Sequence, residues 1–154
     1  MKVTLMNKEY RPITILMAQD DPDDRLLTKD ALAESRLTNE LYFVEDGLEL
    51  LDYLHQRGVY ADPQRAPRPG LILLDLNMPR MDGREALAEI KADPDLRRIP
   101  IVVLTTSKAE QDILNTYDLG VGGFVTKPVS FDGLVEVLKA IGKYWFQIVE
   151  LPPT

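Results

Sequence analysis

Short apolar runs alternate along this chain with longer segments in which apolar residues recur at helical spacing. Runs of this kind, bounded by turn residues, are typical of strands buried on both faces of a sheet. The longer segments place Leu, Ala and Ile every three or four residues, as on one face of an amphipathic helix. The pattern predicts five strands, at 13–18, 41–44, 71–74, 101–104 and 123–126.

A helix is predicted after each strand. The helices are expected from Pro22 to about Ser35, at 47–56, 84–92 and 108–119, and after Ser130. The Pro-rich segment 58–70 is expected to be an irregular loop. The residues predicted to face the core are Leu26, Leu27, Ala31 and Leu32 in the first helix, and Leu48, Leu51 and Leu54 in the second.

Regular alternation of strands and helices indicates the α/β class, with a parallel sheet covered by helices on both faces. The common solution for five strands is the flavodoxin-like, doubly wound sheet with strand order 2-1-3-4-5. We therefore predict this five-stranded fold for the chain.

Polar residues stand where the predicted strands end. Asp20 and Asp21 follow the first strand, Asp75 ends the third, Thr105 follows the fourth and Lys127 follows the fifth. Each residue alone is explained as well by loop or helix capping. In the predicted sheet, however, the carboxyl ends of these strands meet at one crevice, where ligands bind. Independent capping does not predict that coincidence.

Three carboxylates in one crevice repel one another, and a cation would relieve the repulsion. Oxygen ligands favour a hard cation, most plausibly Mg²⁺. A carboxylate beside Mg²⁺, an ammonium and a hydroxyl is suited to accept a phosphoryl group.

Composition narrows the function classes. The chain has 154 residues, of which 45% are hydrophobic and 28% charged, which suits one globular domain. A net charge of −7 argues against binding to nucleic acid or to an anionic membrane. The sequence has no cysteine, and it shows no signal peptide or apolar span, so a cytoplasmic location is expected.

With these motifs in order, the chain resembles the receiver domain of bacterial two-component response regulators from about Ile13 to Tyr144. The resemblance implies that Asp75 is the phosphoacceptor. It also implies a Mg²⁺ site formed by Asp21 as the main ligand, Asp20, Asp75 and the backbone carbonyl of Asn77. The motifs that carry the resemblance are the acidic pair Asp20-Asp21, the segment DLNMPRMDG that begins at Asp75, Thr105, and Lys127-Pro128.

The same resemblance implies a switch. Lys127 would pair with the acid and then with the phosphoryl oxygens, and Thr105 would hydrogen-bond the phosphoryl group. Phe124 takes the place of the family's switch aromatic. Such a protein is a signalling phosphoacceptor rather than a conventional enzyme.

The loop 58–70 and the apolar C-terminal extension at 145–154 resemble those of small stand-alone regulators that pair with phytochrome-type histidine kinases. We expect a lead-in at 1–12, a receiver domain at 13–144 and an apolar extension at 145–154. Few residues follow the last helix, so the expected readout is a surface change seen by a partner protein or a second copy. A homodimer is expected through the helix at 108–119, the strand at 123–126, the last helix and the extension.

Two residues depart from the family pattern, and two alternative functions stay open. Gln19 stands where Glu is usual, and Thr106 stands where many relatives have a smaller residue. One alternative is an adapter receiver that works without phosphorylation. The other is a Mg²⁺-dependent phosphohydrolase with an Asp nucleophile, which needs a second acid at the position that Asn77 occupies. No glycine-rich nucleotide motif follows a strand.

Overall fold

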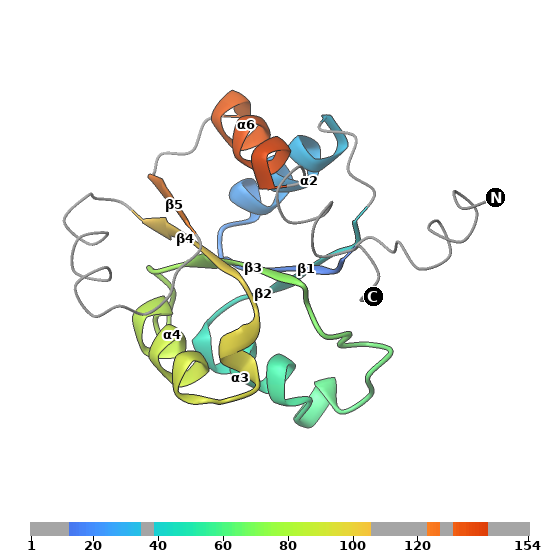
Figure 1. Ribbon diagram of the computed structural model, residues 1–154, viewed down its shortest axis with the longest axis vertical. Helices are drawn as coiled ribbons and strands as arrows, with labels where there is room; N and C mark the ends of the chain where they lie inside the picture. The colour runs from blue at the N-terminus through green and yellow to red at the C-terminus, as the bar shows by residue number, and fades with distance from the viewer. Residues whose placement is uncertain (1–12, 35–38, 106–122, 127–130, 142–154) are drawn as a thin grey trace, which may run out of the picture.

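The computed structural model describes residues 13–34, 39–105, 123–126 and 131–141. Within these ranges the strands form one parallel sheet in the order β2-β1-β3-β4-β5 (Figure 1). Both the fold class and the strand order predicted from the sequence are confirmed. The strands are β1 (Ile15–Ala18), β2 (Leu41–Val44), β3 (Leu71–Asp75), β4 (Ile101–Thr105) and β5 (Gly123–Thr126).

Helices cover both faces of the sheet. Helices α2 (Pro22–Glu34) and α6 (Phe131–Ile141) pack together on one face, and α3 (Gly47–His55) and α4 (Gly83–Ala92) pack together on the other (Figure 1). Two 3₁₀ turns, η1 (Gly58–Tyr60) and η2 (Leu96–Arg98), interrupt the connections. The helix expected at 108–119, the lead-in and the extension at 145–154 lie outside the described residues.

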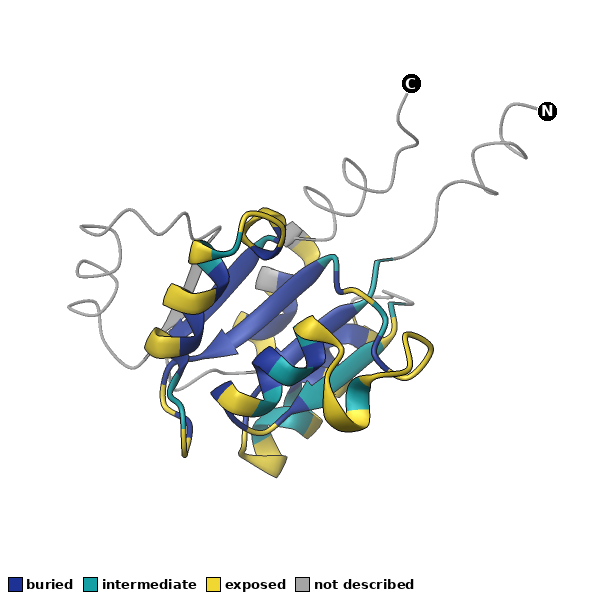
Figure 2. Ribbon diagram, turned by 90° about the horizontal axis from the view of Figure 1, so that it is seen from below, coloured by how far each residue is buried: buried dark blue, intermediate teal, exposed yellow. Residues whose placement is uncertain are grey.

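The core consists of two layers, one on each face of the sheet. Successive strand residues point to opposite faces, so Leu16, Ile72 and Val103 belong to the layer under α3 and α4. Met17 and Leu73 belong to the layer under α2 and α6. Figure 2 shows the central strands as buried and the outer surfaces of the helices as exposed. Strand β2 is mostly of intermediate burial. No helix within the described ranges is long and apolar enough to cross a bilayer.

Two predicted core positions are wrong, because each lies beside the buried face of its helix rather than within it. Leu26 is 57% exposed and Leu48 is 41% exposed. In α2 the buried residues include Thr28. Its hydroxyl donates to the Asp24 carbonyl at 2.9 Å, so this buried polar group has a hydrogen-bond partner. In α3 the buried face includes Leu50 and Leu51, and Leu48 lies beside it.

The loop 58–70 packs against α3 through tyrosines. The Tyr53 hydroxyl donates to the Pro67 carbonyl at 2.8 Å, and the Tyr60 hydroxyl donates to Glu49 Oε2 at 2.6 Å. The two rings lie 5.2 Å apart. Burial raises the pKa of Tyr53 above its ordinary value, so the hydroxyl stays a donor. The loop therefore begins with η1, is otherwise irregular as predicted, and is held by specific contacts.

Candidate functional site

Asp75 is the last residue of the central strand β3, and its side chain is almost completely buried at 1% exposure. Leu74 pairs with Ala18 of β1, and Asp75 pairs with Leu104 of β4. Asp75 therefore stands at the carboxyl edge of the sheet with a neighbouring strand on each side. Its Oδ1 accepts a hydrogen bond from the Asn77 backbone N–H at 3.0 Å, so the following loop orients the carboxylate.

The acidic pair lies just beyond the end of β1, at the same edge of the sheet. Asp21 caps α2, because its Oδ1 accepts from the Asp23 backbone N–H at 2.9 Å. Asp20 is exposed, and no described residue hydrogen-bonds to its carboxylate. The capping explanation considered for these acids therefore holds for Asp21.

Gln19 holds the backbone of the acidic pair. Its side chain is 1% exposed, and its Oε1 accepts from the Asp21 backbone N–H at 3.1 Å. Its own carbonyl accepts from Arg25 Nε at 2.7 Å, and the Arg25 guanidinium lies 5.1 Å from the centre of the Phe43 ring. A neutral residue in this buried position adds no third negative charge to the acidic pair.

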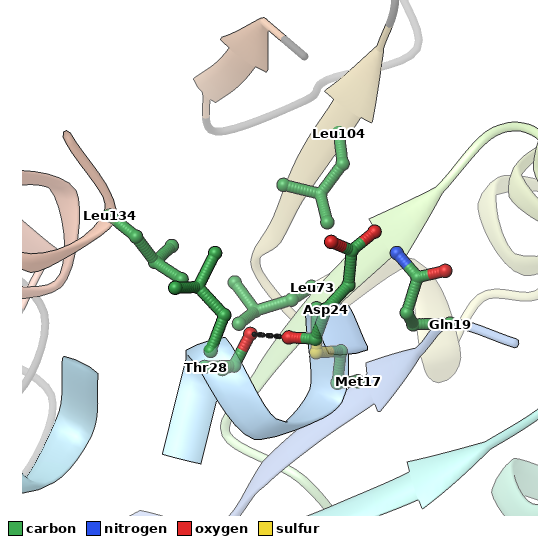
Figure 3. Close-up of a pocket in the computed structure, with 8 residues that line it drawn as sticks. Met17, Gln19, Asp24, Thr28, Leu73, Leu104 and Leu134 are labelled. Carbon is green, nitrogen blue, oxygen red and sulfur yellow. Dashed lines mark hydrogen bonds between the residues drawn. The ribbon is translucent and has the colours of Figure 1, made fainter. Parts of the chain in front are cut away.

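A small cavity opens beside Gln19, between α2 and the sheet (Figure 3). Its volume is about 10 Å³, which is room for one water molecule and too little for an organic ligand. Gln19 Nε2 has no hydrogen-bond partner among the described residues, so a water there would satisfy this donor. The other lining residues are Met17, Asp24, Leu27, Thr28, Leu73, Leu104 and Leu134.

The structure also places the backbones of Thr105 and Phe124, the first at the same edge and the second within a nearby strand. Thr105 is the last residue of β4 and pairs with Thr126 of β5. Phe124 lies in β5 and pairs with Val103. Their side chains, and the whole of Lys127, lie outside what the structure describes.

Asp46 and Arg80, which the sequence analysis did not single out, connect the loop after Asp75 to α3. Arg80 Nε lies 2.6 Å from Asp46 Oδ2, and Asp46 Oδ1 accepts from the Glu49 backbone N–H at 2.8 Å. Burial raises the pKa of Asp46, but the hydrogen bonds from Arg80 and from the Glu49 and Leu48 backbones outweigh it and bring the pKa below its ordinary value. The pair Asp46-Gly47 follows the strand predicted at 41–44 and could have indicated that Asp46 caps a helix. Nothing in the sequence indicates that Asp46 pairs with Arg80.

The predicted metal ligands Asp20, Asp75 and the Asn77 carbonyl suit a hard cation, because their ligand atoms are all oxygens. Within the described residues, no three His, Cys, Asp or Glu side chains are grouped so that they alone could hold a metal ion. This does not argue against Mg²⁺, which ordinarily takes one or two carboxylates and completes its shell with water. Asp20, Asp75 and the Asn77 carbonyl meet that requirement chemically.

Comparison with known proteins identifies a family. The model of the response regulator receiver domain matches residues 15–139. Among curated proteins, the chain is 44% identical over 141 residues to response regulator Rcp1 of Synechocystis sp., and the match covers 92% of this chain and 94% of Rcp1.

Two solved structures resemble this one closely. The phosphorylated cyanobacterial phytochrome response regulator RcpA superposes with a TM-score of 0.78 at 45% identity, covering 93% of this chain and 100% of RcpA. The Mn²⁺-bound form of Rcp1 superposes with a TM-score of 0.76 at 44% identity, covering 92% of this chain and 100% of the Rcp1 chain. The similarity thus extends over nearly the whole chain, in both sequence and fold.

Proposed function

Because the chain belongs to the response regulator receiver domain family, we propose that it is a signalling protein that accepts a phosphoryl group on Asp75 from a sensor histidine kinase. The observation that carries the proposal is the position of Asp75. Its carboxylate ends the central strand at the carboxyl edge of a doubly wound sheet, where such folds bind ligands.

In the proposed reaction an Asp75 oxygen attacks the phosphorus of a phosphohistidine or of a small acyl phosphate. A new O–P bond forms while the donor's bond to phosphorus breaks, and the leaving group keeps that electron pair. The hydrogen bond from the Asn77 N–H to Asp75 Oδ1 holds the carboxylate in one orientation, which reduces the entropic cost of the attack. The product is an acyl phosphate that carries roughly two negative charges.

We propose Mg²⁺ as the cofactor, held by Asp20, Asp21, Asp75 and the backbone carbonyl of Asn77. When bound, the ion would neutralise charge on the transferring phosphoryl oxygens. The family resemblance implies Asp21 as the main ligand, but one oxygen of Asp21 already caps α2 through Asp23, which supports Asp20 as a second direct ligand. Separate Asp20→Asn and Asp21→Asn variants, compared by Mg²⁺ affinity, distinguish the two assignments.

The proposed switch uses Thr105, Lys127 and Phe124. The Lys127 ammonium would pair with the phosphoryl oxygens, and the Thr105 hydroxyl would donate to one of them. Movement of Thr105 would leave space that the Phe124 ring fills, so that a local charge biases a two-state surface. The strand order supports this assignment. Strand β4 lies between β3, which ends at Asp75, and β5, so the carboxyl ends of all three strands lie at one edge of the sheet.

We propose a phytochrome-type histidine kinase as the phosphodonor, in the cytoplasm. The support is the 45% identity to RcpA, which is described as a phytochrome response regulator. We also propose a homodimer through the helix predicted at 108–119, β5, α6 and the extension at 145–154. Size-exclusion chromatography with light scattering, before and after phosphorylation and with the extension removed, tests the dimer.

The proposed function is tested with acetyl phosphate, with and without Mg²⁺, by intact mass spectrometry. The expected result is a Mg²⁺-dependent gain of one phosphoryl group that Asp75→Asn abolishes. Asp82→Asn is the matched control. Asp82 lies in the loop that follows Asp75. It caps α4 by accepting from the Glu85 N–H at 3.0 Å, a bond that Asn can also accept.

Any of three outcomes would overturn the proposal. An adduct that persists in Asp75→Asn would place the acceptor elsewhere. The absence of an adduct under every condition would favour the adapter function, in which the fold binds a partner without chemistry. Release of inorganic phosphate from many added phosphoesters per protein molecule would instead favour the phosphohydrolase.

A further inference from the structure

The loop of residues 76–82, called here the acceptor loop, is docked against the start of α3. The Gly47 backbone N–H donates to the Met81 carbonyl at 2.8 Å. A Cβ atom built on Gly47 would lie 2.5 Å from that same carbonyl oxygen. The two segments therefore touch through their main chains, with no room for a side chain between them.

Arg80 occupies an unusual backbone conformation within this loop. Its φ angle is 61°, in the left-handed region that side chains other than glycine rarely adopt. Such conformations persist where surrounding contacts hold them, and they concentrate at functional sites. The contact that can hold Arg80 is its ion pair with Asp46, since Nε lies 2.6 Å from Oδ2.

The ion pair differs from the other pairs in the described part of the chain in having a buried acid. The Arg80 side chain is 61% exposed, whereas that of Asp46 is 6% exposed. In the pairs Arg57–Asp52, Arg68–Asp95 and Arg84–Asp82, every side chain is at least 35% exposed. Exposed pairs contribute little, but a buried carboxylate that loses its cation is left uncompensated. Asp46 is therefore the one acid of these pairs that can retain an arginine firmly.

Asp46 is also held on its other side. Its Oδ1 accepts the Glu49 N–H and so caps α3, which fixes the carboxylate to a helix rather than to another loop. The two ends of the acceptor loop are joined, because the Gly83 N–H donates to the Leu76 carbonyl at 3.0 Å. The middle of the loop, from Asn77 to Arg80, is thus anchored to α3 through Asp46 and Arg80.

We infer that Arg80 and Asp46 are positioning residues for phosphoryl transfer, which hold the acceptor loop so that Asn77 stays beside Asp75. The inference rests on the proposed function, because it assigns Asn77 the tasks of orienting the Asp75 carboxylate and offering its carbonyl to Mg²⁺. Neither Arg80 nor Asp46 touches the reacting atoms. Loss of their ion pair would let the loop move and would misplace Asn77.

Two variants remove the ion pair without removing the fold. Arg80→Gly deletes the cation and also relieves the left-handed backbone, which glycine adopts freely. Asp46→Asn deletes the charge but keeps an oxygen that can cap α3. Arg68→Ala is the matched control, because it removes an exposed arginine from an ion pair with Asp95 in another loop.

The experiment measures three quantities for each variant: the Mg²⁺ dissociation constant by calorimetry, the initial rate of phosphorylation by acetyl phosphate, and hydrogen exchange of the Asn77 and Gly47 amides. We expect Arg80→Gly and Asp46→Asn each to weaken Mg²⁺ binding and slow phosphorylation about tenfold, since misplacement near 1 Å costs up to ~100-fold. Both amides should exchange faster. The double variant should be no worse than either single variant, because one interaction is lost in all three, and Arg68→Ala should match the wild type.

Metal affinity and phosphorylation rate within twofold of the wild type in both variants would overturn the inference. So would unchanged exchange at Asn77 and Gly47. If the wild type itself takes up no phosphoryl group, the proposed function fails, while Mg²⁺ affinity and amide exchange still decide whether Arg80 and Asp46 anchor the loop.

Discussion

Gly83 is the position at which one added methyl group should most directly disturb the candidate site. It is the first residue of α4. A Cβ atom built on it would lie 2.4 Å from the Asp75 carbonyl oxygen and 2.6 Å from Leu76 Cα. Both are main-chain atoms at the end of the central strand, so they cannot turn aside as a flexible side chain would. Gly83→Ala must therefore push α4 away from Asp75.

The expected size of the effect follows from two opposing contributions. Ala is favoured over Gly inside a helix by about 1 kcal/mol, and by less at a first helical position. Overpacking costs about 1–3 kcal/mol, and contacts of 2.4 and 2.6 Å with the main chain place Gly83→Ala near the upper end. We expect a net loss of about 2 kcal/mol, which lowers the Tm of a 154-residue chain by about 6 °C.

The matched control is Gly133→Ala. Gly133 is an exposed residue of α6, where the same exchange should stabilise the protein by up to ~1 kcal/mol. Thermal and urea unfolding followed by circular dichroism measure both variants, and acetyl phosphate measures the effect on Asp75. A midpoint for Gly83→Ala at or above that of the wild type would refute the argument, because α4 would then not approach Asp75 as closely as the distances indicate.

Three further predictions concern α3 and the contacts around it. Leu50→Ala should cost about 2–5 kcal/mol in urea unfolding, while Leu48→Ala should cost well under half as much, because Leu50 is fully buried and Leu48 is exposed; equal losses would contradict the burial of Leu50 and the exposure of Leu48. Tyr60→Phe should cost about 1 kcal/mol by losing the 2.6 Å hydrogen bond to Glu49, and an unchanged urea midpoint would show that the bond contributes nothing. The Asp46 pKa lies below its ordinary value of 3.8, so its charge stabilises the folded state fully above that pH and loses this effect as the pH falls through the lower, folded-state value. The difference in free energy of unfolding between wild type and Asp46→Asn should therefore be largest near neutral pH and vanish in acid. A difference independent of pH would contradict the lowered pKa of Asp46.

Local patterns were sufficient for the strands. The apolar runs that end at Ala18, Leu74 and Leu104 predicted buried strands, and the structure has β1, β3 and β4 there. The reason is that a strand buried on both faces has few polar positions, so its extent is visible in the sequence. The position of Asp75 at the end of such a strand was visible for the same reason. The prediction began the first strand at residue 13, whereas β1 begins at Ile15.

Helix faces were less predictable. Leu26 and Leu48 look like core residues in the sequence but are exposed, and Thr28 looks like a surface residue but is fully buried. A rotation of one residue turns a helix by about 100°, and a hydroxyl that bonds to its own helix can enter the core. Which face turns inward depends on the neighbouring elements, which a local pattern does not contain.

The sequence by itself determined the fold class, the strand order expected of five alternating units, and the places of Asp20, Asp75 and Thr105 at or just past the carboxyl ends of neighbouring strands. Only the tertiary structure decided the capping role of Asp21, the burial of Gln19 and the ion pair between Asp46 and Arg80. Strand positions follow from hydrophobic burial, which each segment carries in its own residues. Hydrogen bonds and ion pairs depend on atoms brought within about 3 Å of one another from distant segments, and that proximity exists only once the chain has folded.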